Sequence, residues 1–117
     1  MTNPPIEEQK EIIKNFEEGP LVLGEILCPI SSEWFNKWKD FVGYDKDSEP
    51  TFVEIRAIDN SKIIEKDRLK NNLEEEEDYI LLRKQSYDKL QEWYSGDKPI
   101  EMDVIADKQG QPTVVKR

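Results

Sequence analysis

Apolar residues recur at helical spacing in two segments of the first half of the chain. The first segment follows Pro4-Pro5, which suits a first helical turn, and ends at the C-cap signal Gly19-Pro20. The second begins at Ser31-Ser32, either of which can cap a helix, and closes at Gly43. Its spacing predicts one broad apolar face, made of Trp34, Phe35, Trp38, Phe41 and Val42.

The second half of the chain predicts a third substantial helix and a shorter one. Ser86 is expected to cap the long helix, in which Tyr87, Leu90 and Tyr94 lie on one side, and Gly96 ends it. A short helix is predicted over Asp67–Leu73, because Leu69 and Leu73 stand four residues apart.

Other apolar stretches have the length and alternation of strands. Since they follow no repeated strand–helix–strand rhythm, the fold class is α+β with a small antiparallel sheet of about three strands. The predicted strands are Leu21–Leu27, interrupted by Gly24, then Thr51–Ile55 as a short extended segment, Tyr79–Leu82, Ile100–Val104, and Thr113–Val115 after a turn at Gln109-Gly110.

Length and charge limit the classes of function. A chain of 117 residues forms one domain with a modest core. Its net charge of -9 repels nucleic-acid phosphates and anionic membranes, so neither is an expected partner. No apolar run approaches the ~20 residues of a membrane span, and the acidic start does not have the form of a signal peptide. We therefore expect an intracellular protein.

Catalytic chemistry has few groups to use. The chain has no histidine, the usual general base and the commonest zinc ligand. Its single cysteine, Cys28, excludes an internal disulfide and lies in an apolar stretch, where it is expected to be buried as a small hydrophobe. No phosphate-binding glycine loop is present. The sequence therefore predicts no enzyme, cofactor or metal site.

Two acidic segments suggest chemistry that their surroundings do not support. Asp45, Asp47 and Glu49 have the spacing with which a calcium loop begins, but Pro50 replaces the required glycine and Arg56 the bidentate glutamate. The run at residues 74–78 (Glu-Glu-Glu-Glu-Asp) can serve as a patch for a basic partner, although such runs are usually solvated surface.

Aromatic side chains are the better candidates for contact with a partner. Most of them must form the core of so small a domain. Since the aromatic residues of the second helix cannot all point inward, we expect Trp34 or Phe35 to stay partly exposed, and likewise Trp93 or Tyr94.

The order and intervals of several motifs resemble the DUSP domain, the non-catalytic module found in ubiquitin-specific proteases. The similarity covers residues from about 9 to 105. The motifs are the aromatic segment Trp34–Val42, Ile58-Asp59-Asn60-Ser61, Leu69-Lys70 before Leu73, Asp78–Leu81, Leu90 before Trp93-Tyr94, and Pro99-Ile100.

This resemblance implies a tripod-like fold, in which a three-helix bundle packs against a three-stranded antiparallel sheet. It implies no hydrolase activity here, because the protease chemistry belongs to a separate catalytic domain. Residues 1–117 would form one such domain, and residues 106–117 a terminal strand or a linker. Many family members carry Pro-Gly-Pro-Ile before Asp-Asn-Ser, whereas this chain has Ile55-Arg56-Ala57-Ile58. Losing two prolines and a glycine predicts a different backbone path there.

The leading hypothesis is a monomeric protein-interaction module of a deubiquitinating enzyme. Its partner would be a substrate, a regulator or the attached protease itself. Its binding surface would include Ile58, Asp59, Asn60 and any exposed aromatic among Trp34, Phe35, Trp93 and Tyr94. The alternatives are a rigid spacer between neighbouring domains, or a free-standing adaptor or inhibitor that binds a basic partner through its acidic face.

Overall fold

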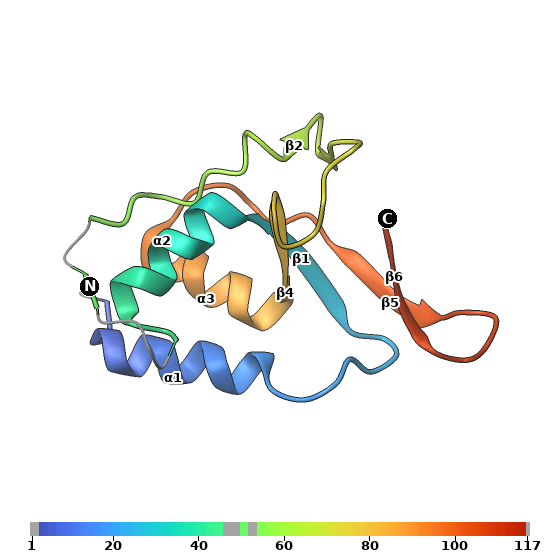
Figure 1. Cartoon of the computed structure of the whole chain (residues 1–117), viewed down its shortest axis with the longest axis horizontal. Coiled ribbons are helices and arrows are strands. Elements are labelled where there is room, and N and C mark those ends of the chain that lie inside the picture. Colours follow the sequence, from blue (N-terminus) through green and yellow to red (C-terminus); the bar gives the residue numbers. More distant parts are fainter. Residues whose placement is uncertain (1–2, 46–49, 52–53, 117) are drawn as a thin grey trace.

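The structure is a computed structural model that describes residues 3–45, 50–51 and 54–116. Within these residues three helices and six strands alternate along the chain (Figure 1). Their order is α1 Ile6–Glu17, β1 Ile26–Ser31, α2 Ser32–Val42, β2 Ile64–Glu65, β3 Arg68–Leu69, β4 Tyr79–Arg83, α3 Lys84–Tyr94, β5 Met102–Ala106 and β6 Pro112–Lys116.

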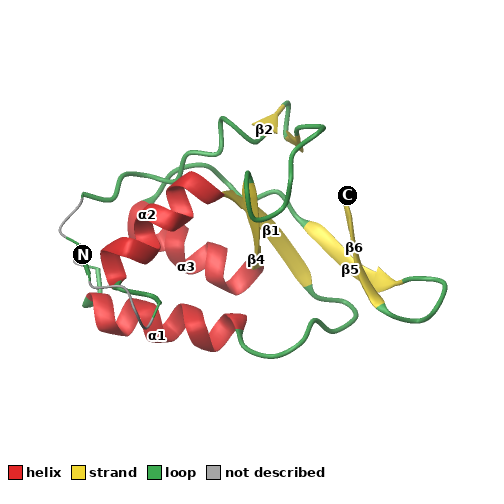
Figure 2. Cartoon of the chain, in the orientation of Figure 1, coloured by secondary structure: helices red, strands yellow, loops and turns green. Residues whose placement is uncertain are grey.

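The larger sheet has four antiparallel strands in the order β4-β1-β5-β6, and β2 and β3 form a separate hairpin (Figure 2). The pairing of β1 with β4 joins segments about fifty residues apart in sequence, with Pro29 opposite Leu81. β5 pairs with β1 at Ile26 and Leu27, and with β6 along its whole length. The predicted class, α+β with an antiparallel sheet, is confirmed, but the sheet has four strands instead of three.

The helices pack against one half of this sheet. α1 contacts α2, α3 and β4, and both α2 and α3 contact β1 and β4. The β5–β6 hairpin extends away from the helices, and the β2–β3 hairpin lies beside the sheet on a long connection (Figure 1). The molecule is elongated as a result, with extents of 45 × 31 × 28 Å.

The core forms where the aromatic face of α2 meets α1, α3 and β1. Trp38 is fully buried, and its ring stacks on Phe35 with 5.4 Å between centroids. The indole Nε1 of Trp38 donates to Oε1 of Gln9 at 3.2 Å, so α1 supplies the polar partner that a buried indole needs. Cys28 is fully buried, as its apolar surroundings predict.

The first strand was predicted in the wrong place. β1 covers Ile26–Ser31 instead of Leu21–Leu27. Pro29 argues against a central strand, because it cannot donate to a neighbour. Alternate residues of a strand direct their backbone nitrogens to the same edge. The nitrogen of Pro29 therefore faces the same edge as the N–H of Ser31, which donates to Asn60. β5 pairs with β1 only at residues 26 and 27, so the missing donor leaves that pairing intact.

The short helix predicted over Asp67–Leu73 is also wrong, because this segment contains β3 and the turn of a hairpin. Lys66 and Asp67 both have positive φ, 52° and 61°, as a type I′ turn requires. Consecutive left-handed residues cannot continue a right-handed helix. The turn at Lys66 and Asp67 therefore decides the local structure, and the four-residue spacing of Leu69 and Leu73 does not.

The third helix is confirmed, but Ser86 does not cap it. α3 begins at Lys84, and the Ser86 side chain is buried inside its first turn, where its hydroxyl donates to Glu17. A short extended segment was predicted over Thr51–Ile55. Residues 51, 54 and 55 are not in a strand, and residues 52–53 lie outside the described residues. Asp47 and Glu49 of the acidic loop also lie outside them.

Candidate functional site

A cleft of about 390 Å³ opens between the start of α2 and the segment that leads to β2. Its walls combine apolar side chains with three acidic and three basic ones, so the cleft is balanced in charge on a chain of net charge -9. We call it the α2 cleft. Its lining residues are Ser31, Glu33, Trp34, Lys37, Glu54, Ile55, Arg56, Ala57, Asp59 and Lys62.

The backbone wall of the cleft is held by α2. Nε1 of Trp34 donates to the carbonyl oxygen of Arg56 at 2.9 Å. The Trp34 ring is itself fixed by an edge-on contact with Tyr94 of α3, at 5.8 Å between centroids. The Trp34 side chain is 7% exposed, and the Arg56 side chain points to solvent as an exposed residue.

The far end of this wall is joined to the end of α3. The N–H of Ile58 donates to the Ser95 carbonyl at 3.0 Å, and the N–H of Asp97 donates back to the Ile58 carbonyl at 2.9 Å. Gly96 lies between these two bonds with φ of 108°. A Cβ on Gly96 would stand 2.3 Å from the Ile58 nitrogen, so only glycine permits this approach.

Asn60 is a structural residue whose polar side-chain atoms are directed into the protein. Its Oδ1 accepts from the N–H of Ser31 at 2.8 Å, and its Nδ2 donates to the Tyr87 hydroxyl at 2.9 Å. Its own N–H donates to Oδ2 of Asp97 at 2.8 Å. Because the side chain is 2% exposed, Asn60 positions the cleft and offers little surface to a partner.

Asp59 is the neighbour that faces solvent. Its Oδ1 accepts from the N–H of Ser61 at 2.9 Å, which makes the short turn that the Asp-Asn-Ser sequence predicts. Hydrogen bonds from the side chain and backbone of Ser61 lower the pKa of Asp59, so the exposed carboxylate is negative at neutral pH. Of the predicted motif Ile58-Asp59-Asn60, only Asp59 presents its side chain at the surface.

The rim of the cleft contains an ion-pair network that the sequence did not single out. Glu33 pairs with Lys62 across the cleft and with Lys37 one turn along α2, the latter at 3.7 Å. The bond from Lys62 lowers the pKa of Glu33 and keeps it charged. The four-residue spacing of Glu33 and Lys37 could have been found in the sequence, whereas Lys62 comes near only through the fold.

The aromatic candidates lie mostly in the core. Trp34 and Phe35 are 7% and 4% exposed, so the expectation that one of them stays exposed is wrong. Phe35 also packs edge-on against Tyr44, which covers it from the end of α2. Trp93 and Tyr94 are both half-buried, and neither lines the cleft. Whether these four residues contact a partner stays a prediction.

The described residues form neither a membrane-spanning helix nor a cluster of metal ligands. Among them, none of the helices has the length and hydropathy needed to traverse a bilayer. Within the same part of the chain, no three side chains of His, Cys, Asp or Glu gather as metal ligands would. The fold and the cleft therefore define a small α+β domain with a preformed, charged surface cleft.

Residues 24–106 match the family model of the DUSP domain, and the chain belongs to this family. Three similar proteins are described as ubiquitin carboxyl-terminal hydrolases. Hydrolase 10 of Arabidopsis thaliana is 35% identical, in a match that covers 85% of this chain and 12% of the relative. Hydrolase 15 of Xenopus tropicalis is 32% identical, covering 86% and 11%. Hydrolase 15 of Homo sapiens is 30% identical, covering 86% and 11%. The chain thus spans about an eighth of the length of these relatives.

Proposed function

We propose that this domain is a non-catalytic accessory module of a ubiquitin-specific protease, and that it binds a protein partner through the α2 cleft. The observation that carries the proposal is the set of hydrogen bonds that hold the cleft wall in place. Trp34 and Asn60 fix its wall through buried hydrogen bonds, while Asp59 and Arg56 stay exposed on its rim. A preformed surface with exposed charges loses little conformational entropy on binding.

The non-catalytic part of the proposal rests on the available chemistry. A cysteine protease needs an accessible thiolate beside a base, which is usually histidine. The chain has no histidine, and Cys28 is fully buried. A partner of the module would be a substrate or regulator of the protease, or its catalytic domain. An intracellular location and a monomeric state stay predictions made from the sequence.

Affinity capture with quantitative mass spectrometry tests the cleft. The bait is the domain itself, beside Asp59→Lys, Arg56→Glu and the control Lys108→Glu, whose exposed side chain lies in the turn between β5 and β6. We expect a partner that the wild type and Lys108→Glu retain and that both cleft variants lose. Matching thermal melts would establish that all four proteins are folded.

The partner identified in this way is then purified for titration. The proposal requires that Asp59→Lys weakens its binding to the domain at least about tenfold, which corresponds to ~1.4 kcal/mol. Equal affinities of the wild type and both cleft variants would place the binding surface elsewhere.

A rigid spacer is the second candidate, favoured by the shape of the molecule. Its longest extent is 45 Å, and α1 and the β5–β6 hairpin lie toward opposite ends of that axis (Figure 1). Domains attached at these ends would be held apart at a set distance. A full-length protease whose activity depends on the length of this domain, and is insensitive to Asp59→Lys, would support the spacer over the binding module.

A further inference from the structure

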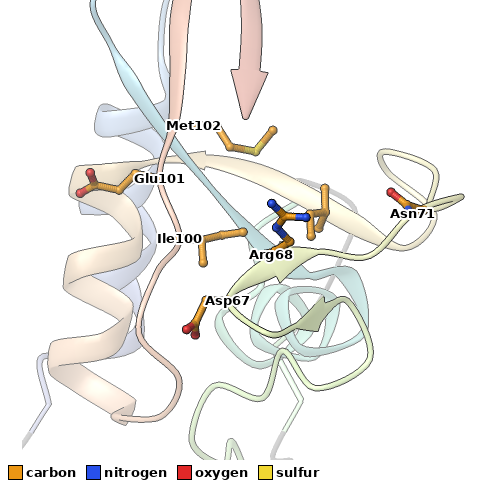
Figure 3. A pocket seen from close by; sticks show the side chains of 7 residues that line it. Asp67, Arg68, Asn71, Ile100, Glu101 and Met102 are labelled. Atoms are coloured by element: carbon orange, nitrogen blue, oxygen red, sulfur yellow. The ribbon is translucent and has the colours of Figure 1, made fainter. Parts of the chain in front are cut away.

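A second groove, of about 530 Å³, lies between the β2–β3 hairpin and the start of β5. It shares no lining residue with the α2 cleft. We call it the hairpin groove. Figure 3 shows its side chains, which are Asp67, Arg68, Leu69, Asn71, Ile100, Glu101 and Met102. Its volume is within the range of ~300–1,000 Å³ typical of ligand-binding pockets.

The hairpin side of the groove is fixed by its own hydrogen bonds. The type I′ turn at Lys66 and Asp67 places Arg68 opposite Glu65. At the open end of the hairpin, the N–H of Lys70 donates to the Ile63 carbonyl at 2.7 Å. Ile63 is 2% exposed, so the hairpin is anchored in the protein by this side chain. The position of Arg68 is therefore built into the fold.

The floor of the groove is apolar. Leu69 and Met102 are each 6% exposed, and Ile100 is half-buried between them and solvent. Figure 3 shows the Ile100 side chain directed toward Arg68, while Glu101 points to the opposite side, toward α3. Glu101 lies 4.0 Å from Lys84 of α3. The other acidic residue of the lining is Asp67, and Figure 3 shows its carboxylate directed away from Arg68 as well.

The cation in the groove has no counter-ion among the described residues. Arg68 is exposed, and no carboxylate of the described part of the chain forms an ion pair with it. The chain holds 26 acidic residues against 17 basic ones, and Arg68 still has none of the described carboxylates as a partner. Lys66, Lys70 and Lys98 stand next to the lining segments in sequence and likewise form no ion pair with the described carboxylates.

We propose that the hairpin groove is a second docking site, which takes an extended peptide segment of a partner protein with an acidic residue beside an aliphatic one. The carboxylate pairs with the guanidinium of Arg68, which presents several donors in a planar fork. The aliphatic side chain packs on Leu69, Ile100 and Met102. The charge of Arg68 and the apolar floor together select this class of peptide over a purely anionic ligand.

Fluorescence anisotropy with synthetic peptides tests the proposal. The probe is a labelled octapeptide, Gly-Ser-Asp-Leu-Asp-Ile-Ser-Gly. One control peptide replaces both aspartates by lysine, and the other replaces leucine and isoleucine by serine. We expect the probe to bind the domain, and each control peptide to bind at least about tenfold more weakly. The lysine peptide cannot pair with Arg68, and the serine peptide cannot pack on the apolar floor.

Charge reversal on the protein locates the site. Arg68 is exposed, and Arg68→Glu leaves the turn residues intact. We expect this variant to bind the probe at least about tenfold more weakly than the wild type does. Arg56→Glu changes the same charge in the α2 cleft and is expected to alter binding less than about twofold, so failure of the one site is distinguishable from failure of the other. Amide NMR shifts on adding the probe should centre on residues 67–71 and 100–102.

Three results would overturn the proposal. One is absence of binding by the probe at millimolar protein concentration. Another is equal binding of the probe to the wild type and to Arg68→Glu. The third is equal or tighter binding of the serine peptide or of a short single-stranded oligonucleotide, which would make the groove a general anion site without peptide selectivity.

Discussion

At the scale of single residues, Asn60 and Asp59 are adjacent in sequence and opposite in role. Replacing Asn60 by Ala would leave the N–H of Ser31 without its acceptor in a buried place and remove a bond to Tyr87. We expect Asn60→Ala to lower the free energy of unfolding by about 2–4 kcal/mol. Urea denaturation followed by tryptophan fluorescence measures this change.

Asp59→Ala is the matched control for that measurement. It removes one exposed turn hydrogen bond, so it should cost less than about 1 kcal/mol. Equal losses for the two variants would contradict the structural role given to Asn60 and would return it to the binding surface.

Glu17 is one residue through which pH should affect stability. Burial raises its pKa above the ordinary 4.5, although bonds from Ser86 and Arg83 act in the opposite direction. A carboxyl with a higher pKa in the folded state stabilises the fold below the unfolded pKa, and this contribution is lost as pH rises through the folded pKa.

Glu17→Gln cannot titrate, so its stability relative to the wild type should rise as the pH is raised above 4.5, the ordinary pKa of a glutamate. Urea unfolding of both proteins at several pH values measures the difference. If the difference falls with pH instead, the hydrogen bonds outweigh the burial, and the pKa of Glu17 is lowered.

The sequence predicted the burial of some residues but not of others. Trp38 was placed in the core because helical spacing puts it on an apolar face, and Cys28 because its neighbours in sequence are apolar. The burial of Trp34 was missed because its cover comes from the segment around Arg56, 22 residues away, and no periodicity reports such a contact. The unpaired state of Arg68 was equally invisible, since it depends on where the acidic side chains lie in space.

At the scale of elements, the close approach of the Ile58 segment to the end of α3 depends on Gly96. An alanine there would place its Cβ 2.3 Å from backbone nitrogen, and backbone cannot rotate aside as a side chain can. We expect Gly96→Ala to lower the free energy of unfolding by at least about 3 kcal/mol, measured by thermal or urea denaturation.

Gly110 provides the comparison, because its φ of 79° is also left-handed but its Cβ would meet open space. Gly110→Ala should therefore cost only about 1 kcal/mol, the strain of the backbone alone. Similar effects for the two variants would show that the Ile58–Gly96 contact adds nothing to stability.

Helices were easier to predict than strands in this chain, for a physical reason. The three long helices are predicted by the spacing of apolar residues and by end signals, and both lie within each helical segment. The strands depend on partners far away, as β1 does on β4. The short β2–β3 hairpin has a Lys-Asp turn in place of the Asn-Gly that usually marks a type I′ turn, so its sequence signal is weak.

At the scale of the whole molecule, the helix α1 lies outside the segment that matches the family but is part of the same core. Ile13 is fully buried, and Oε1 of Gln9 accepts from both Trp38 and Tyr94. Arg83 of β4 donates to four carbonyl groups between Phe16 and Pro20, and its Nε lies 3.0 Å from Oε1 of Glu25.

A chain that begins at Gly24 should therefore fail to fold, even though residues 24–106 contain the family match. Loss of Ile13 alone would be expected to cost about 2–5 kcal/mol, against the ~5–15 kcal/mol that holds a domain together. Near-ultraviolet circular dichroism would show the missing tertiary packing. A chain that begins at Pro4 is the control and should melt as the whole domain does. A cooperative transition in the shorter chain would contradict the role of α1.

The attachment of the β5–β6 hairpin has a consequence for how the domain opens. Among the described strands, β6 pairs only with β5, and β5 reaches β1 through two residues and the neighbouring Gly24–Glu25 backbone. β6 can thus separate locally while β5, in which Met102 and Val104 are buried, stays with the packed helices and β1–β4. Amide hydrogens of β6 should exchange with solvent long before those of β1 and β4. Local unfolding would then begin at β6 while the central strands keep their hydrogen bonds.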